Sequence, residues 1–182
     1  MRVISGSARG KKLETVEGMD TRPTTDRVKE SVFNIIQMRV RGARVLDLFA
    51  GSGQMGIEAL SRGAEFCVFA DKAPKAQAVI RKNLAAAHVQ ERAQLLGCDF
   101  EAAVRRVKEQ KFDLIYLDPP YGGTILNQAL QTIESFDILQ TDGIIICESF
   151  CDDRIECPER FEVLKQYKYG TIRLTTMALR TE

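Results

Sequence analysis

The sequence lacks the features of membrane, secreted and fibrous proteins. No apolar run approaches the roughly 20 residues of a membrane-spanning helix, and no apolar stretch follows the basic start to form a secretory signal. Five cysteines are an odd number without the spacing of a disulfide framework, so we expect reduced thiols in a cytoplasmic protein. Apolar residues are 45% of the 182 and charged residues 28%, which excludes a disordered chain.

Side chains that commonly bind metals are also sparse. His88 is the only histidine and follows an expected helix, where a capping or surface role is expected. Cys147, Cys151 and Cys157 lack a second closely spaced pair, and Arg154 stands where an iron–sulfur motif would need its third cysteine. We therefore expect no metal.

Positive charge is concentrated near the start of the chain. Residues 1–44 have ten Lys or Arg against five Asp or Glu, and residues 45–182 have sixteen against twenty. This asymmetry favours a basic segment that binds an anionic partner, although a solvated surface would give the same pattern. Arg9, Lys11 and Lys12 precede the first acid, Glu14, and are candidate phosphate contacts.

Short apolar strands alternate with helices along most of the chain. Strands that are apolar on both faces and separated by helices predict a parallel sheet covered on both sides. We expect strands over residues 44–49, 66–70, 93–98, 112–118 and 143–147, and helices over 55–62, 74–88, 100–109 and 124–139. In the second of these helices, Ala78, Leu84 and Ala85 fall on one side.

The two ends of the chain depart from this alternation. The β-rich runs 161–169 and 171–179 predict an antiparallel hairpin at one sheet edge. Residues 1–20 predict a small basic hairpin appendage outside the main sheet, and a helix follows Asp26 within a domain spanning 21–182. The predicted fold class is α/β: a Rossmann-like, doubly wound, mostly parallel seven-stranded sheet with a C-terminal antiparallel hairpin.

A glycine-rich loop follows the first strand. Gly51, Gly53 and Gly56 form GxGxxG between a strand and a helix, the context that nucleotide-binding loops require. The pattern fits a dinucleotide or S-adenosylmethionine. Asp47 favours the second, because a carboxylate repels a pyrophosphate and suits a cationic sulfonium and amino group.

Two further acids end the next strands. Asp71 follows Gly51 by 20 residues, where a carboxylate accepts hydrogen bonds from ribose hydroxyls. Asp99 is expected either to accept from an adenine amino group or to cap the next helix. The predicted cofactor-binding residues are Asp47, Phe49, Ala50, Gly51, Ser52, Gly53, Asp71, Lys72, Cys98, Asp99 and Phe100.

The tetrapeptide Asp118, Pro119, Pro120 and Tyr121 ends the fourth strand. In a doubly wound sheet this strand lies beside the first, so both motifs open on one cleft. An exocyclic amino group is a poor nucleophile until oxygen acceptors bind its N–H groups and favour a pyramidal nitrogen. The Asp118 carboxylate and the Pro119 carbonyl are such acceptors, the prolines supply no donor, and Tyr121 offers a face for a base.

These motifs resemble those of S-adenosylmethionine-dependent amino-methyltransferases. The segment 21–28, TRPTTDRV, together with residues 1–6 and 9–13, is similar to bacterial 16S rRNA guanine-N2 methyltransferases of the RsmD type. The resemblance implies methylation of a guanine N2 in small-subunit rRNA already carrying ribosomal proteins. It adds Arg22, Pro23 and Thr24 to the candidate substrate-binding residues. We also expect a monomer. The chain departs from the family at Cys98, where glycine is usual, and at Ser149, where histidine is frequent. Because Ser149 directly follows Glu148, the second departure leaves the role of Glu148 open.

Three other functions compete with this interpretation. A DNA adenine-N6 methyltransferase shares the acid-Pro-Pro-Tyr chemistry, but the chain has no obvious target-recognition domain. An NAD-linked oxidoreductase shares GxGxxG, but His88 is poorly placed for hydride chemistry. A non-catalytic RNA-binding module would not need either site motif. Binding of S-adenosylmethionine, S-adenosylhomocysteine or NAD separates these classes.

Overall fold

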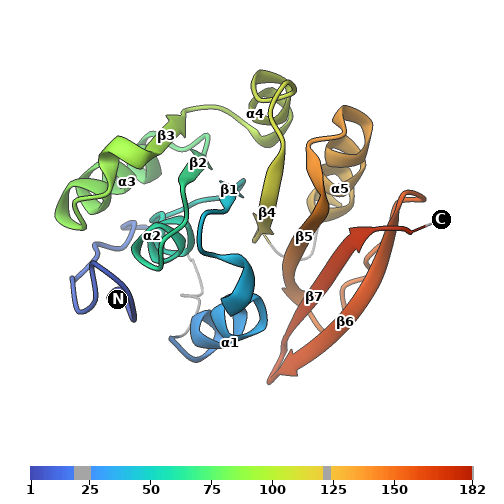
Figure 1. The fold of residues 1–182 in the computed structure, drawn as a ribbon, viewed down its shortest axis with the longest axis horizontal. Coiled ribbons are helices and arrows are strands. Elements are labelled where there is room, and N and C mark those ends of the chain that lie inside the picture. The colour runs from blue at the N-terminus through green and yellow to red at the C-terminus, as the bar shows by residue number, and fades with distance from the viewer. Residues whose placement is uncertain (19–25, 121–123, 182) are drawn as a thin grey trace.

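The computed structural model describes residues 1–18, 26–120 and 124–181 (Figure 1). The described helices are α1 (Asp26–Ile36), α2 (Gln54–Ser61), α3 (Pro74–Ala86), α4 (Phe100–Arg106) and α5 (Ile125–Phe136). The described strands are β1 (Arg44–Asp47), β2 (Phe66–Ala70), β3 (Ala93–Leu96), β4 (Phe112–Leu117), β5 (Leu139–Phe150), β6 (Phe161–Tyr169) and β7 (Ile172–Leu179).

The seven strands form one sheet in the order β3-β2-β1-β4-β5-β7-β6. Strands β1 to β5 pair in parallel, and β7 pairs antiparallel with both β5 and β6. The strand order across the sheet reverses at β1, which lies between β2 and β4. The predicted α/β class, the mostly parallel sheet and its antiparallel C-terminal hairpin are confirmed.

Helices cover both faces of the sheet. Helices α1, α2 and α3 lie on one side and α4 and α5 on the other (Figure 1). Each side has its own apolar core: Phe33 and Ile57 belong to the first, and Val104 and Ile133 to the second. Strand residues alternate between the two cores, as in Leu46 and Val45 of β1, which explains why these strands are apolar on both faces.

The boundary between α5 and β5 corrects two expectations. The helix predicted to reach residue 139 ends at Phe136, because Asp137 adopts the left-handed conformation with φ 51°. Lys111 and Arg160 bind the Asp137 carboxylate and stabilise this turn. Leu139 then begins β5 opposite Phe112, so this strand is much longer than the predicted 143–147.

The face of α3 was also predicted wrongly. Ala78 and Ala85 are exposed, whereas Ile80, Leu84 and the polar Asn83 are buried. Alanine is small enough to be tolerated on either face, so its position did not define the apolar side. Helix α4 ends at Arg106, shorter than the expected 100–109.

Residues 1–18 fold back against α2 and α3 (Figure 1). An isolated antiparallel bridge joins Arg2 and Lys12 outside the main sheet. Val3, Ala8 and Leu13 are buried in the same core as α1 and α2. The predicted boundary at residue 20 lies outside the described residues, so the division into an appendage and a domain stays a prediction.

The helices described here include none with the length and apolar character of a membrane span.

Candidate functional site

The glycine loop lies between β1 and α2. Gly51 and Gly53 have φ values of 56° and 79°, a region that favours glycine over residues with a side chain. The N–H of Gly53 donates to the carbonyl of Ala50 over 2.7 Å, which closes a tight turn. A Cβ added at Gly51 would enter open space, so a ligand has room to approach the loop backbone closely.

Asp71, at the end of β2, holds this loop from the side. Its Oδ2 accepts from the N–H of Gly51 and its Oδ1 from the N–H of Ala73, each over 2.9 Å. Each carboxylate oxygen has a second lone pair, so these bonds leave acceptor capacity. Asp71 is half-buried, and it lies where the sequence predicts the ribose acceptor, directly against the glycine loop.

Asp47 lies beneath the loop and is only 2% exposed. Its Oδ2 accepts from the N–H of Gly56 over 3.1 Å, in the first turns of α2. Burial raises the pKa of the Asp47 carboxyl to about 7 against the opposing effect of this hydrogen bond. The acidic side chain of Asp47 thus already occupies the helix start that a dinucleotide pyrophosphate would use, and this disfavours an anionic ligand there.

The loops after β1 and β3 bring two aromatic rings together. Phe49 and Phe100 have centroids 5.6 Å apart with planes inclined by 42°. Cys98, like both rings, packs at the edge of the core beneath α4. Asp99 caps α4, since its Oδ1 accepts from the N–H of Ala102 over 2.8 Å. The helix-cap alternative for Asp99 is thus observed, and a contact with adenine stays a prediction.

The remaining predicted cofactor residues differ in exposure. Ala50 and Gly53 are buried, Gly51 and Ser52 are half-buried, and Lys72 is exposed.

Asp118 follows β4, the strand directly beside β1. Asp47 and Tyr116 are register partners across these strands, so the glycine loop and Asp118 leave the sheet at the same edge. Asp118 is half-buried, Pro119 is buried and Pro120 is exposed. Tyr121 lies outside the described residues. The predicted neighbourhood of the two motifs is therefore present.

Beside this edge, Glu148, whose role the sequence leaves open, forms a buried polar pair that the sequence does not predict. The Tyr116 hydroxyl donates to Oε2 of Glu148 over 2.6 Å, and Glu148 is 2% exposed. Burial, followed by the nearby Glu148 and Asp118 charges, holds the pKa of Tyr116 well above its usual range, so the hydroxyl stays a donor. The sequence does contain a sign of this pair, since Glu148 directly follows the apolar run 143–147.

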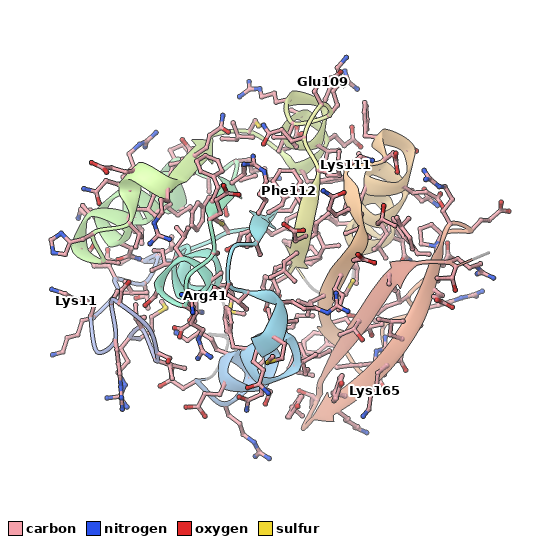
Figure 2. The ribbon with its side chains drawn as sticks, viewed as in Figure 1. Lys11, Arg41, Glu109, Lys111, Phe112 and Lys165 are labelled. Carbon is pink, nitrogen blue, oxygen red and sulfur yellow. The ribbon has the colours of Figure 1, made fainter. Side chains whose placement is uncertain are left out.

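The described basic candidate residues lie within residues 1–18, the N-terminal segment. Arg9, Lys11 and Lys12 are exposed, and Lys11 extends away from the body of the molecule (Figure 2). Arg22, Pro23 and Thr24 lie outside the described residues.

In the described ranges, no group of three or more His, Cys, Asp or Glu side chains is placed to hold a metal ion. The five cysteines are unpaired thiols, and burial raises the pKa of Cys147.

A doubly wound sheet, a glycine loop at its switch point and an acid-Pro-Pro sequence on the neighbouring strand together define a nucleotide-cofactor methyltransferase class. The family model described as "Conserved hypothetical protein 95" matches residues 1–178, and the chain belongs to this family. This is the family of the RsmD-type methyltransferases that the sequence motifs resemble, and that resemblance is confirmed.

Named relatives and solved structures agree. The chain is 44% identical over 181 residues to "Putative rRNA methyltransferase YlbH" of Bacillus subtilis (strain 168), covering 98% of this chain and 97% of the relative. It is 32% identical to "Ribosomal RNA small subunit methyltransferase D" of Haemophilus influenzae, covering 94% and 90%. A solved Escherichia coli structure, "Putative methyltransferase yhhF", superposes with a TM-score of 0.85 at 26% identity, covering 100% and 99%.

S-adenosylmethionine is the cofactor of this methyltransferase fold, as the sequence predicts, and the residues present fit it. Above Gly51 there is open space, and Asp71 has acceptor capacity beside it. Oε1 of Gln54, at the start of α2, is a buried acceptor with no hydrogen-bond partner among the described residues. Acceptors at this edge suit a ligand with a ribose and an ammonium group.

Proposed function

We propose that the protein transfers a methyl group from S-adenosylmethionine to the exocyclic N2 of a guanine in 16S rRNA. The substrate we propose is a small ribosomal subunit that is assembled or partly assembled. The position of Asp118 directly after β4, at the sheet edge where the glycine loop follows β1, carries the proposal. Relatives named as small-subunit rRNA methyltransferases support the RNA substrate.

Asp118 and Pro119 act on the attacking nitrogen. The Asp118 carboxylate and the Pro119 carbonyl accept the two N–H bonds of the guanine amino group, which releases its lone pair from conjugation with the ring. Proline has no N–H, so the backbone presents only acceptors at this point. When bound, S-adenosylmethionine supplies an electrophilic methyl carbon with a neutral thioether leaving group. Asp118 also receives the proton, which becomes acidic once the nitrogen is methylated.

The cofactor contacts are assigned from the same edge of the sheet. Asp71 accepts from the ribose hydroxyls, Phe49 and Phe100 flank the adenine, and Asp99 faces its amino group. Gln54 accepts from the cofactor ammonium through Oε1, and Asp47 stabilises the positive charge from below.

The exposed cations of the N-terminal segment hold the RNA. Arg9, Lys11 and Lys12, which are exposed, contact RNA phosphates. Tyr121 stacks on the target base. A monomeric state and a cytoplasmic location remain predictions.

Transfer of a labelled methyl group tests the substrate. Purified protein is incubated with labelled S-adenosylmethionine and, in parallel, small subunits, naked 16S rRNA and duplex DNA, all lacking the modification. We expect label in small-subunit RNA and none in DNA. Greater transfer to naked 16S rRNA than to subunits would reject the assembled substrate, and transfer to DNA alone would favour the adenine-N6 alternative.

A further inference from the structure

The N-terminal segment and the glycine loop meet at one side chain, Asn83 of α3. Its Oδ1 accepts from the N–H of Glu14 over 2.8 Å, and its Nδ2 donates to the Glu14 carbonyl over 3.0 Å. The same Nδ2 donates to the carbonyl of Ser52 over 2.9 Å. The Asn83 amide therefore links Ser52 in the glycine loop, 31 positions earlier in the chain, to Glu14 in the N-terminal segment, 69 positions earlier.

These bonds use both N–H groups of the Asn83 side chain and one oxygen lone pair. Asn83 is only 1% exposed, so water does not replace a lost partner easily. A second contact joins the same two segments, since the Ser52 hydroxyl lies 3.5 Å from the Met1 sulfur. The N-terminal segment thus packs against the glycine loop, in addition to carrying exposed cations.

The loop depends on such outside support. Ser52 lies between Gly51 and Gly53, two residues whose backbones have little intrinsic conformational preference. Two side chains outside the loop fix the loop conformation. Asp71 accepts from the N–H of Gly51, and Asn83 donates to the carbonyl of Ser52. Loss of either support would widen the set of loop conformations and reduce the fraction competent to bind.

We propose that Asn83 is a positioning residue for the cofactor, which makes the N-terminal segment a structural part of the cofactor site. Asn83 does not contact the reacting atoms; it holds the glycine loop and the segment around Glu14 as one unit. The inference rests on the proposed cofactor and is independent of the RNA substrate.

Ser61 provides a matched control. Its hydroxyl accepts from the N–H of Ala8 over 2.9 Å and donates to the carbonyl of Ser5 over 2.6 Å, so it anchors the same N-terminal segment. Ser61 is the last residue of α2, at the end away from the glycine loop. Ser61→Ala therefore loosens the segment without removing a bond to Ser52.

The experiment measures S-adenosylhomocysteine affinity by calorimetry, without RNA, for the full chain and its variants. We expect Asn83→Ala to weaken binding about tenfold, the effect of losing the one buried hydrogen bond that holds the glycine loop, and Ser61→Ala to change it less than twofold. With substrate RNA, Asn83→Ala should raise KM for S-adenosylmethionine and leave kcat at saturating cofactor within about twofold, since the reacting groups are untouched.

Asn83→Asp is the second variant, in case Asn83→Ala does not fold. It preserves the side-chain size and the acceptor for the N–H of Glu14, but it replaces the donor to the Glu14 and Ser52 carbonyls with an acceptor. Affinity unchanged within twofold in the folded variant, or equal weakening by Asn83 and Ser61 variants, would overturn the inference. Failure of the parent protein to bind S-adenosylhomocysteine would instead reject the proposed cofactor and this inference together. Tight binding by the parent without any rRNA methylation would reject only the proposed substrate.

Discussion

The carboxylate of Asp71 accepts a hydrogen bond from the backbone N–H of Gly51 over 2.9 Å and thereby joins the end of β2 to the loop after β1. The two residues are 20 positions apart in the chain and follow two neighbouring parallel strands, β1 and β2. One acid thus shapes the glycine loop and, in the proposed function, binds the ribose.

Replacing Asp71 tests this double role. Asp71→Ala removes the bond to Gly51 and the proposed bonds to the ribose, each charge-assisted bond being worth roughly 1.5–3 kcal/mol. We expect S-adenosylhomocysteine affinity to fall by at least about tenfold in calorimetry. Arg81→Ala, at an exposed position on α3 to which no site role is assigned, serves as a control with little expected effect. Unchanged affinity in Asp71→Ala would reject the ribose assignment.

Asp118 is expected to serve catalysis more than cofactor binding. Asp118→Ala removes one preorganised acceptor from the attacking amino group, so kcat should fall on the order of a hundredfold or more. Cofactor affinity should stay within a few fold, because the glycine loop is intact. Single-turnover transfer of a labelled methyl group gives the rate. A near-normal rate would show that Asp118 does not act on the amino group.

The exposed cations of the N-terminal segment should set the salt dependence of RNA binding. Binding to single-stranded RNA changes with a log–log slope of roughly −0.7 per phosphate neutralised. Changing Arg9, Lys11 and Lys12 together to alanine should weaken RNA binding, flatten this slope and spare cofactor affinity.

A control with the same loss of charge replaces Lys108, Lys165 and Lys168, which are exposed elsewhere on the surface. Lys165 lies on β6, on the opposite side of the molecule from Lys11 (Figure 2). If the N-terminal triple variant and the parent gave superimposable RNA affinities across a salt series, these cations would only solubilise the segment.

The buried Asp47 carboxyl should reduce stability as pH rises. Its pKa is raised from 3.8 to about 7, so between these values the unfolded chain releases a proton that the native protein retains. The free energy of unfolding therefore falls across this window, by about 4 kcal/mol for this group, and is flat above it. Asp47→Asn removes the effect.

Urea unfolding of the parent and Asp47→Asn measures the difference. The stability of the variant relative to the parent should grow steadily from about pH 4 to about pH 7 and then stay constant. Every other carboxyl group is common to both proteins and cancels. A difference that did not vary with pH would contradict the raised pKa.

Local sequence predicted much of the architecture because the strands are apolar on both faces and end in glycine or acid. The alternation around residues 44–118 sufficed to place β1 beside β4 and to bring Asp47, Asp71 and Asp118 to one edge. Element ends were less predictable. The left-handed turn at Asp137 depends on Lys111 and Arg160, which are distant in sequence.

The roles of Asn83 and Glu148 could not be predicted for a different reason. Asn83 is buried on α3 because its partners, Glu14 and Ser52, are backbone groups of other segments. Glu148 is buried because Tyr116 donates to it from the neighbouring strand. Such pairings arise only when the fold brings the segments together, so composition and spacing give little sign of them.

Identification of the methylated nucleoside tests the proposed function most directly. Small ribosomal subunits lacking the modification are methylated with the purified protein, and their 16S rRNA is digested to nucleosides and analysed by mass spectrometry. We predict N2-methylguanosine at a single site, absent when Asp118→Ala replaces the parent enzyme. Methyl groups found only on adenine N6, or no methylated guanosine despite tight S-adenosylhomocysteine binding, would contradict it.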